Sequence, residues 1–166
     1  MVLMAPAHFS LRHNHLVWLA VIGAVLIVIA SAVSIIINNF GGNTTQLLIG
    51  NAAFDARVAK TEDQRVNGLS GTPSLGNREA LLMVFPSNGD WQIWMKDMKY
   101  PIDIIWLDDQ KRVVYMVQDA QPEEPASKIY APDVDARYVV ELAAGTIQKI
   151  SIRSGQAAIF DVGEPS

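Results

Sequence analysis

The chain lacks cysteine, and its three histidines, His8, His13 and His15, all lie near the N-terminus. Without cysteine there can be no disulfide, no thiol catalysis and no thiolate metal site. Without histidine, the rest of the chain can form neither a Ser–His dyad nor a metal site that uses imidazole ligands. We therefore expect no metal ion and no cofactor.

Charge is also scarce in the first third of the chain. Arg12 is the only Lys or Arg before Arg57, and no acidic residue precedes Asp55. The whole chain carries 13 Lys and Arg against 17 Asp and Glu, a formal net charge of -4. A mildly acidic protein without a basic stripe is a poor candidate for nucleic-acid binding, so we expect no nucleic-acid partner.

Residues 16–37 form an uncharged run, LVWLAVIGAVLIVIASAVSIII. About 20 apolar residues in a helix are enough to span a bilayer core. Arg12 precedes the run, which predicts a cytoplasmic tail at 1–15, a single transmembrane helix at 16–37 in contact with membrane lipid, and the rest of the chain outside the cytoplasm. The alternative is a cleaved signal peptide, for which Ala30-Ser31-Ala32 has the small-x-small form. Both interpretations place the later domain outside the cytoplasm.

The remainder divides into a linker at 38–50 and a domain at 51–163. Strand-like runs dominate the domain, and Asp109-Gln110-Lys111 has the composition of a hairpin turn between two of them. The Thr61-x-x-Gln64 pattern predicts a short capped helix, and a second helical turn is expected from Thr146. We predict a mainly β fold, a small β-barrel or sandwich with one or two short helices.

Several blocks resemble the DUF192 family, also called UPF0127. The matching segments are EDQRVNGLS, ALLMVF, IWMKDMKYPIDIIWLDD, YVVELAAG and IRSGQAAIF, within Phe54 to Asp161. The sequence departs from the family pattern at Ser70, Thr72 and Asp97. The resemblance implies a compact β-rich fold, often behind an export signal or a lipid anchor. The family has no assigned function, so the resemblance implies no reaction.

Two carboxylates interrupt apolar strands, Asp103 in IDIIWL and Glu141 in YVVEL. One hypothesis makes them an acid/base pair of a hydrolase, which for a glycosidic bond requires a separation of roughly 5 to 9.5 Å. The alternative, which we favour, is that both acids are satisfied by Arg65, Lys96 or backbone N–H groups. Pro101 marks the strand entry, so Asp103 is expected as an internally paired acid in a shallow cleft.

The candidate ligand-binding residues are therefore Arg65, Trp94, Lys96, Asp103 and Glu141. We predict a membrane-anchored, non-catalytic binding module at the cell envelope, with a glycan or a protein as its ligand. An envelope hydrolase using Asp103 and Glu141 is the alternative. A third hypothesis is an assembly partner of a membrane complex that associates through residues 16–37.

Overall fold

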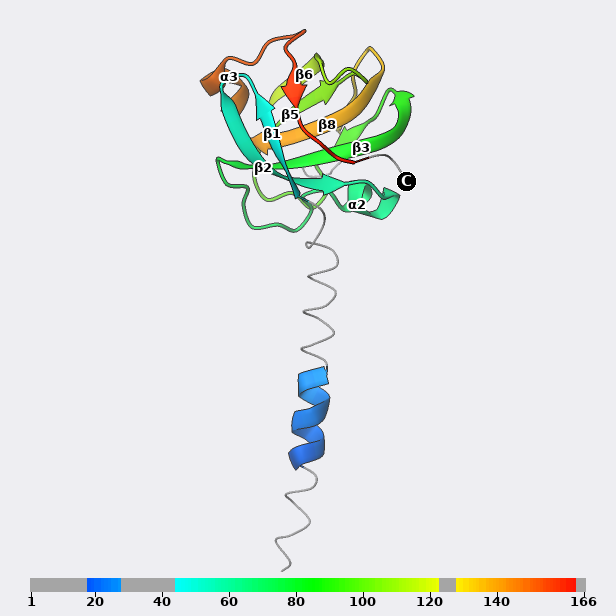
Figure 1. Cartoon of the computed structure of the whole chain (residues 1–166). Coiled ribbons are helices and arrows are strands. Elements are labelled where there is room, and N and C mark those ends of the chain that lie inside the picture. The colour runs from blue at the N-terminus through cyan, green and yellow to red at the C-terminus, as the bar shows by residue number, and fades with distance from the viewer. Residues whose placement is uncertain (1–17, 28–43, 123–127, 164–166) are drawn as a thin grey trace, which may run out of the picture. The chain divides into compact units, whose positions relative to one another are not determined.

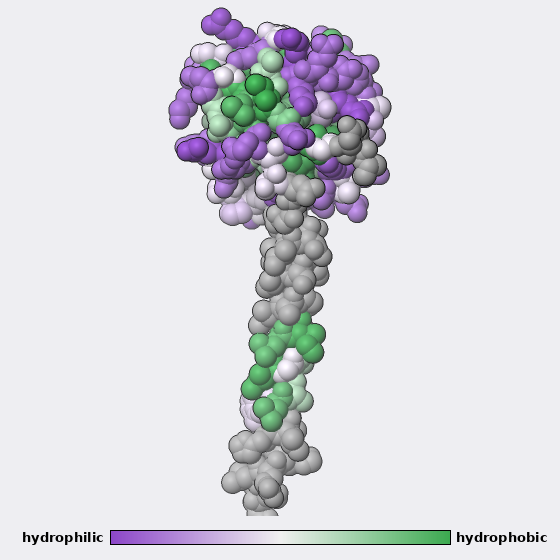
Figure 2. Space-filling model, in the orientation of Figure 1, coloured by the Kyte–Doolittle hydropathy of each residue, from purple (hydrophilic) through white to green (hydrophobic). Residues whose placement is uncertain are grey.

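The computed structural model describes residues 18–27, 44–122 and 128–163, in two units, 1–41 and 42–166. In the first unit, residues 18–27 are helical and mostly hydrophobic on the surface (Figure 2). No helix among the described residues is both long enough and apolar enough to cross a membrane. The other residues of the expected span at 16–37, and the expected tail at 1–15, lie outside the described residues.

The second unit is a curled β-sheet with two short helices (Figure 1). Its seven-stranded sheet has the order β6-β5-β8-β3-β2-β1-β9. These strands are β1 (Thr44–Ile49), β2 (Ala52–Ala59), β3 (Glu79–Gly89), β5 (Ile102–Leu107), β6 (Val113–Ala120), β8 (Ala136–Ala143) and β9 (Ala158–Ile159). A separate two-stranded sheet pairs β4 (Ile93–Trp94) with β7 (Ile129–Tyr130), and the helices are α2 (Glu62–Asn67) and α3 (Thr146–Ile150).

The two ends of the curled sheet meet. An antiparallel bridge joins Arg112, just before β6, to Ala157, just before β9. The N–H of Ala158 also donates to the carbonyl of Lys111 at 2.8 Å. Such contacts protect strand edges, as barrels do. The prediction of a mainly β, barrel-like domain with short helices is confirmed.

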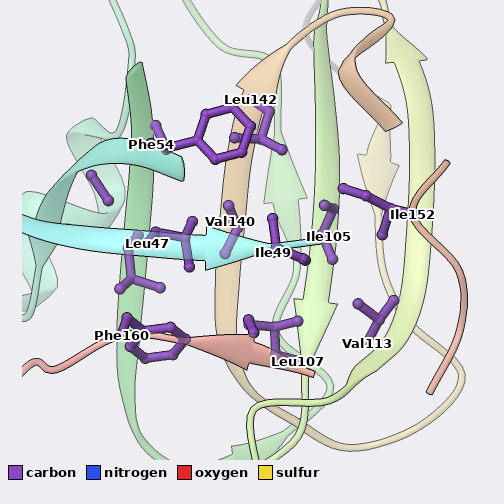
Figure 3. Packing of buried hydrophobic residues seen from close by; sticks show 14 of the residues in the cluster. Leu47, Ile49, Phe54, Ile105, Leu107, Val113, Val140, Leu142, Ile152 and Phe160 are labelled. Atoms are coloured by element: carbon purple, nitrogen blue, oxygen red, sulfur yellow. The ribbon is translucent and has the colours of Figure 1, made fainter. Parts of the chain in front are cut away.

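The sheet separates two hydrophobic cores. The inner core receives side chains from every strand of the large sheet, and Figure 3 shows Leu47, Ile105 and Val140 within it. The outer core lies on the other face of β3, β5 and β8, where Leu81, Met83 and Trp106 pack with residues from outside the large sheet, namely Leu69, Ile93 and Met95. Side chains alternate between the two cores along each strand, because successive residues point to opposite faces.

The clearest sequence signals are confirmed. Thr61 caps α2, and the side chain of Gln64 completes the capping box. The β5–β6 hairpin turns where expected, with Lys111 at a φ of 60° and its N–H donating to the carbonyl of Asp108 at 3.0 Å. The predicted helical turn from Thr146 is α3.

The domain begins earlier than predicted. β1 occupies Thr44–Ile49, inside the linker expected at 38–50, and pairs with β2 along its whole length. Leu47 and Ile49 are fully buried in the inner core, so the sheet needs this strand. β-branched Thr44 and Thr45 suit a strand, although their polarity favoured a linker.

β3 and β4 are the longest and one of the shortest of the described strands. β3 continues through Pro86 to Gly89, with a shift in its pairing to β8 between Val84 and Gly89. This irregularity accommodates a residue that has no N–H to donate. β4 is only two residues long, and just before it Trp91 stacks on Phe85, with ring centres 4.3 Å apart, while its carbonyl accepts the indole N–H of Trp106.

Candidate functional site

Asp103 lies on β5 and faces the inner core, with no exposed surface. One carboxylate oxygen accepts the N–H of Asp119 at 2.9 Å, and the other accepts the N–H of Ile147 at 2.7 Å. Helix α3 has glycine at its N-cap position and no side-chain cap of its own. From its position on β5, the Asp103 carboxylate therefore accepts an N–H group at the start of α3, where the helix itself provides no acceptor. Its partners are backbone groups, as one of our alternatives held, and not Arg65 or Lys96.

Glu141 faces the opposite side of the sheet. In the β5–β8 pairing, Asp103 lies opposite Leu142, and Ile104 lies opposite Glu141. Residues that lie opposite one another share a face, and successive residues do not. Leu142 belongs to the inner core and Ile104 to the outer core. The sheet therefore separates the two carboxylates, and the structure does not bring them together as an acid/base pair.

Glu141 lines a groove of about 620 Å³ on the outer face of the sheet, which we call the outer groove. Its walls come from α2 and the turn that follows it, from β3 and from the β4–β7 sheet. Met83, Phe85 and Ile102 contribute apolar surface to this groove. Three large hydrophobic side chains that line it are exposed to solvent, Val66 at 53%, Trp94 at 45% and Ile129 at 56%.

The Glu141 side chain is almost completely buried, with 4% of its surface exposed. Its neighbours on the same face are Leu81 of β3 and Ile104 of β5. Burial among them raises the pKa of Glu141 to about 7, and the positive charge of Arg57 acts in the opposite direction. Glu141 can thus change its protonation state near neutral pH, which is a common property of functional sites.

Arg65 also lines the outer groove, and one nitrogen of its guanidinium, Nη1, donates to backbone carbonyls. Nη1 donates to the carbonyl of Lys60 and, at 3.0 Å, to the carbonyl of Val84. The guanidinium carbon lies 5.1 Å from the centre of the Phe85 ring. Arg65 therefore fastens α2 to β3 and shapes the groove wall.

Lys96 lies beside the groove, through its contact with Trp94. The ammonium is 5.4 Å from the centre of the Trp94 ring, a cation–π arrangement. The carbonyl of Lys96 accepts the hydroxyl of Ser70 at 2.8 Å. Of the five candidate residues, the structure places Arg65, Trp94 and Glu141 in one groove, Lys96 next to it and Asp103 on the other side of the sheet.

The sequence analysis missed the exposed side chains at the groove rim. Val66 follows Arg65 on α2, and Ile129 follows a Pro-rich acidic stretch of sequence, so neither belongs to a recognisable pattern. It also missed Tyr100, whose hydroxyl lies 2.5 Å from that of Thr72. Burial raises the pKa of Tyr100, and the nearby charge of Glu141 adds to this shift.

Among the described residues, no group of three or more histidine, cysteine, aspartate or glutamate side chains could hold a metal ion. The outer groove offers apolar contact around the buried carboxyl group of Glu141.

Comparison with known proteins identifies the family to which the chain belongs. The family model of DUF192, described as an uncharacterized ACR, matches residues 45–160, and the chain belongs to this family. It is 32% identical over 109 residues to a UPF0127 protein of Thermococcus gammatolerans, covering 64% of this chain and 67% of the relative. A UPF0127 protein of Thermococcus sibiricus is 30% identical over 110 residues, covering 65% and 67%.

Two crystal structures share the fold. A Sinorhizobium meliloti protein, provisionally assigned as a transcription regulator, has a TM-score of 0.65 at 20% identity, over 70% of this chain and 92% of the other. A Novosphingobium aromaticivorans protein of unknown function has a TM-score of 0.64 at 20% identity, over 70% and 83%. At this identity the likeness concerns the fold alone.

The substitution Asp103→Asn tests the structural assignment of Asp103. The amide nitrogen would face a backbone N–H donor, so one buried N–H would lose its acceptor. Such a loss costs about 1–3 kcal/mol, and the free energy of unfolding measured with denaturant should fall by about this amount. In the control Asp119→Asn, the side chain is exposed and the N–H to Asp103 is kept, so stability should change by less than about 0.5 kcal/mol. Wild-type stability in Asp103→Asn would contradict the assignment.

Proposed function

We propose that this domain is a non-catalytic binding module whose outer groove takes an apolar segment of a protein ligand at the cell envelope. The observation that carries the proposal is the gathering of exposed Val66, Trp94 and Ile129 around one groove. Exposed apolar side chains that cluster mark interaction sites, whereas scattered ones do not. An apolar groove with few polar groups suits recognition of apolar side chains.

The polar groups of the groove favour a protein ligand over a glycan. The guanidinium of Arg65 donates to backbone carbonyls, the hydroxyl of Ser70 donates to Lys96, and the indole N–H of Trp91 donates to the carbonyl of Ser87 at 3.0 Å. These donors are already occupied, whereas a sugar needs hydrogen-bond partners for its hydroxyl groups. The separation of Asp103 and Glu141 argues against the two-carboxylate hydrolase.

We also propose that the domain lies outside the cytoplasm, tethered to the membrane. The uncharged run at 16–37 and the preceding Arg12 support a membrane tether that holds the domain outside the cytoplasm. Large hydrophobic side chains within the described helical residues support it as well, since Trp18, Leu19 and Ile27 are 64%, 65% and 71% exposed.

Protease added outside intact cells tests this location. We expect the domain to be degraded while cytoplasmic marker proteins remain intact, because the bilayer protects only the cytoplasmic side. A domain that is degraded only after the cells are lysed would contradict the proposed location.

Methyl NMR of the full-length chain labelled at methionine tests the groove. The probe is the acetylated pentapeptide amide Ala-Leu-norleucine-Leu-Ala. We expect saturable shifts at the methyl groups of Met83 and Met98, which line the groove, and none at Met116, which packs against the inner core. Trp94→Ala should weaken binding roughly tenfold, because the contact with a large apolar side chain is lost.

The matched control is Val134→Ala, because Val134 is as exposed as Trp94, 45% in each case, and does not line the groove. Equal affinities in the two variants, or no shift with the peptide at millimolar concentration, would refute the proposal. Shifts at Met83 with a trisaccharide of N-acetylglucosamine, but not with the peptide, would instead identify a glycan site.

A further inference from the structure

The outer groove combines apolar walls with an acidic group at its floor. Met83, Phe85 and Ile102 line it together with the almost completely buried carboxyl group of Glu141. A purely apolar occupant would pack against the apolar walls. It would offer no polar group to this carboxyl group. An occupant with an alkyl stem and a terminal cation would satisfy both, since a lysine side chain buries its stem along apolar surface and keeps its charge at the tip.

The charged groups around Glu141 leave room for a further cation. Arg57 of β2 is the positive charge that acts on the Glu141 carboxyl group, while the adjacent positions of β3 and β5 hold Leu81 and Ile104. The other basic groups at the groove have partners of their own. The guanidinium of Arg65 donates to the carbonyl of Val84, and the ammonium of Lys96 lies over the ring of Trp94.

The other acidic side chains near Glu141 add negative charge, and the hydroxyl group of Tyr100 adds none while it is protonated. Glu79 and Glu141 both act on Tyr100, and each raises the pKa of that hydroxyl. Glu62 lies at the exposed start of α2 and lines the groove. Of the charged residues that line the groove, Glu62 and Glu141 are acidic and Arg65 alone is basic, which favours a cationic occupant over an anionic one.

We propose that the ligand segment carries a lysine, or a comparable alkylammonium group, that enters the outer groove and pairs with the carboxylate of Glu141. This inference rests on the proposed function, because it names the chemistry of the segment that the groove binds. Glu141 is then the residue that selects a basic ligand, and the apolar walls accommodate the stem of the ligand side chain. A charged hydrogen bond at the end of an apolar path gives specificity that apolar contact alone cannot give.

A lysine paired with Glu141 determines whether the affinity for the ligand rises or falls with pH. The pKa of Glu141 in the free protein is about 7. A cationic ligand favours the ionised carboxylate, so it lowers this pKa, and binding at lower pH must release a proton from Glu141. The affinity for a lysine peptide should therefore rise as the pH increases through about 7. A neutral peptide removes further water from the carboxyl group and raises its pKa, so its affinity should fall over the same range.

The experiment compares two acetylated pentapeptide amides on the full-length chain, Ala-Leu-Lys-Leu-Ala and its norleucine counterpart, by the methyl shifts of Met83 and Met98. The two peptides differ only by the ammonium group, since lysine and norleucine have the same four side-chain carbons. Above pH 7, we expect the lysine peptide to bind roughly tenfold more tightly. The preference should disappear in Glu141→Gln and persist in Asp63→Asn, the matched change of an exposed acid on α2 that does not line the groove.

The unshifted methyl resonance of Met116 in the inner core reports whether Glu141→Gln is folded. If that variant does not fold, the opposite pH dependences of the two peptides on the wild-type chain decide the question. Equal affinity of the two peptides above pH 7 would overturn this inference and leave the proposed function intact. Failure of both peptides to bind would overturn both.

Discussion

The pairing of β5 with β8 determines what each carboxylate of this domain can do. Asp103 lies opposite Leu142, and Ile104 lies opposite Glu141. Because a strand alternates its side chains between the two faces, this alignment sends Asp103 into the inner core and Glu141 to the outer groove. A shift of one residue would exchange these faces and expose the apolar side chains of both strands to the wrong surroundings.

The two acids then meet different physical conditions. Asp103 accepts N–H groups from Asp119 and Ile147, so its negative charge is compensated by hydrogen bonds that connect β6, β5 and α3. Glu141 has apolar neighbours, and the charge of Arg57 offsets only part of the cost of burying it. One carboxylate stabilises the fold, and the other lies at the outer groove with a raised pKa.

The sequence predicted the features that depend on local pattern. Residues close together in the sequence determine each of these features: the capping box at Thr61 and Gln64, the turn before Arg112 and the alternation around Asp103. β1 was missed because its polar start resembles a linker, although Thr44 and Thr45 are good strand formers.

The candidate site was predicted in part, for a physical reason. Arg65, Trp94 and Glu141 do share one groove, yet the side of the sheet that Asp103 occupies depends on the alignment of two distant strands, which no single strand encodes. Ile129 joins the groove through the β4–β7 pairing, again a contact between distant segments.

The central claim is that Glu141 is a buried carboxyl group at the floor of an apolar groove. The carboxyl 13C resonance of Glu141, identified by its loss in Glu141→Gln, reports its ionisation directly as the pH of the full-length chain is raised. We predict a midpoint of about 7. A midpoint near the ordinary glutamate value of 4.5 would contradict the account, because it would show that the carboxyl group is hydrated or fully paired.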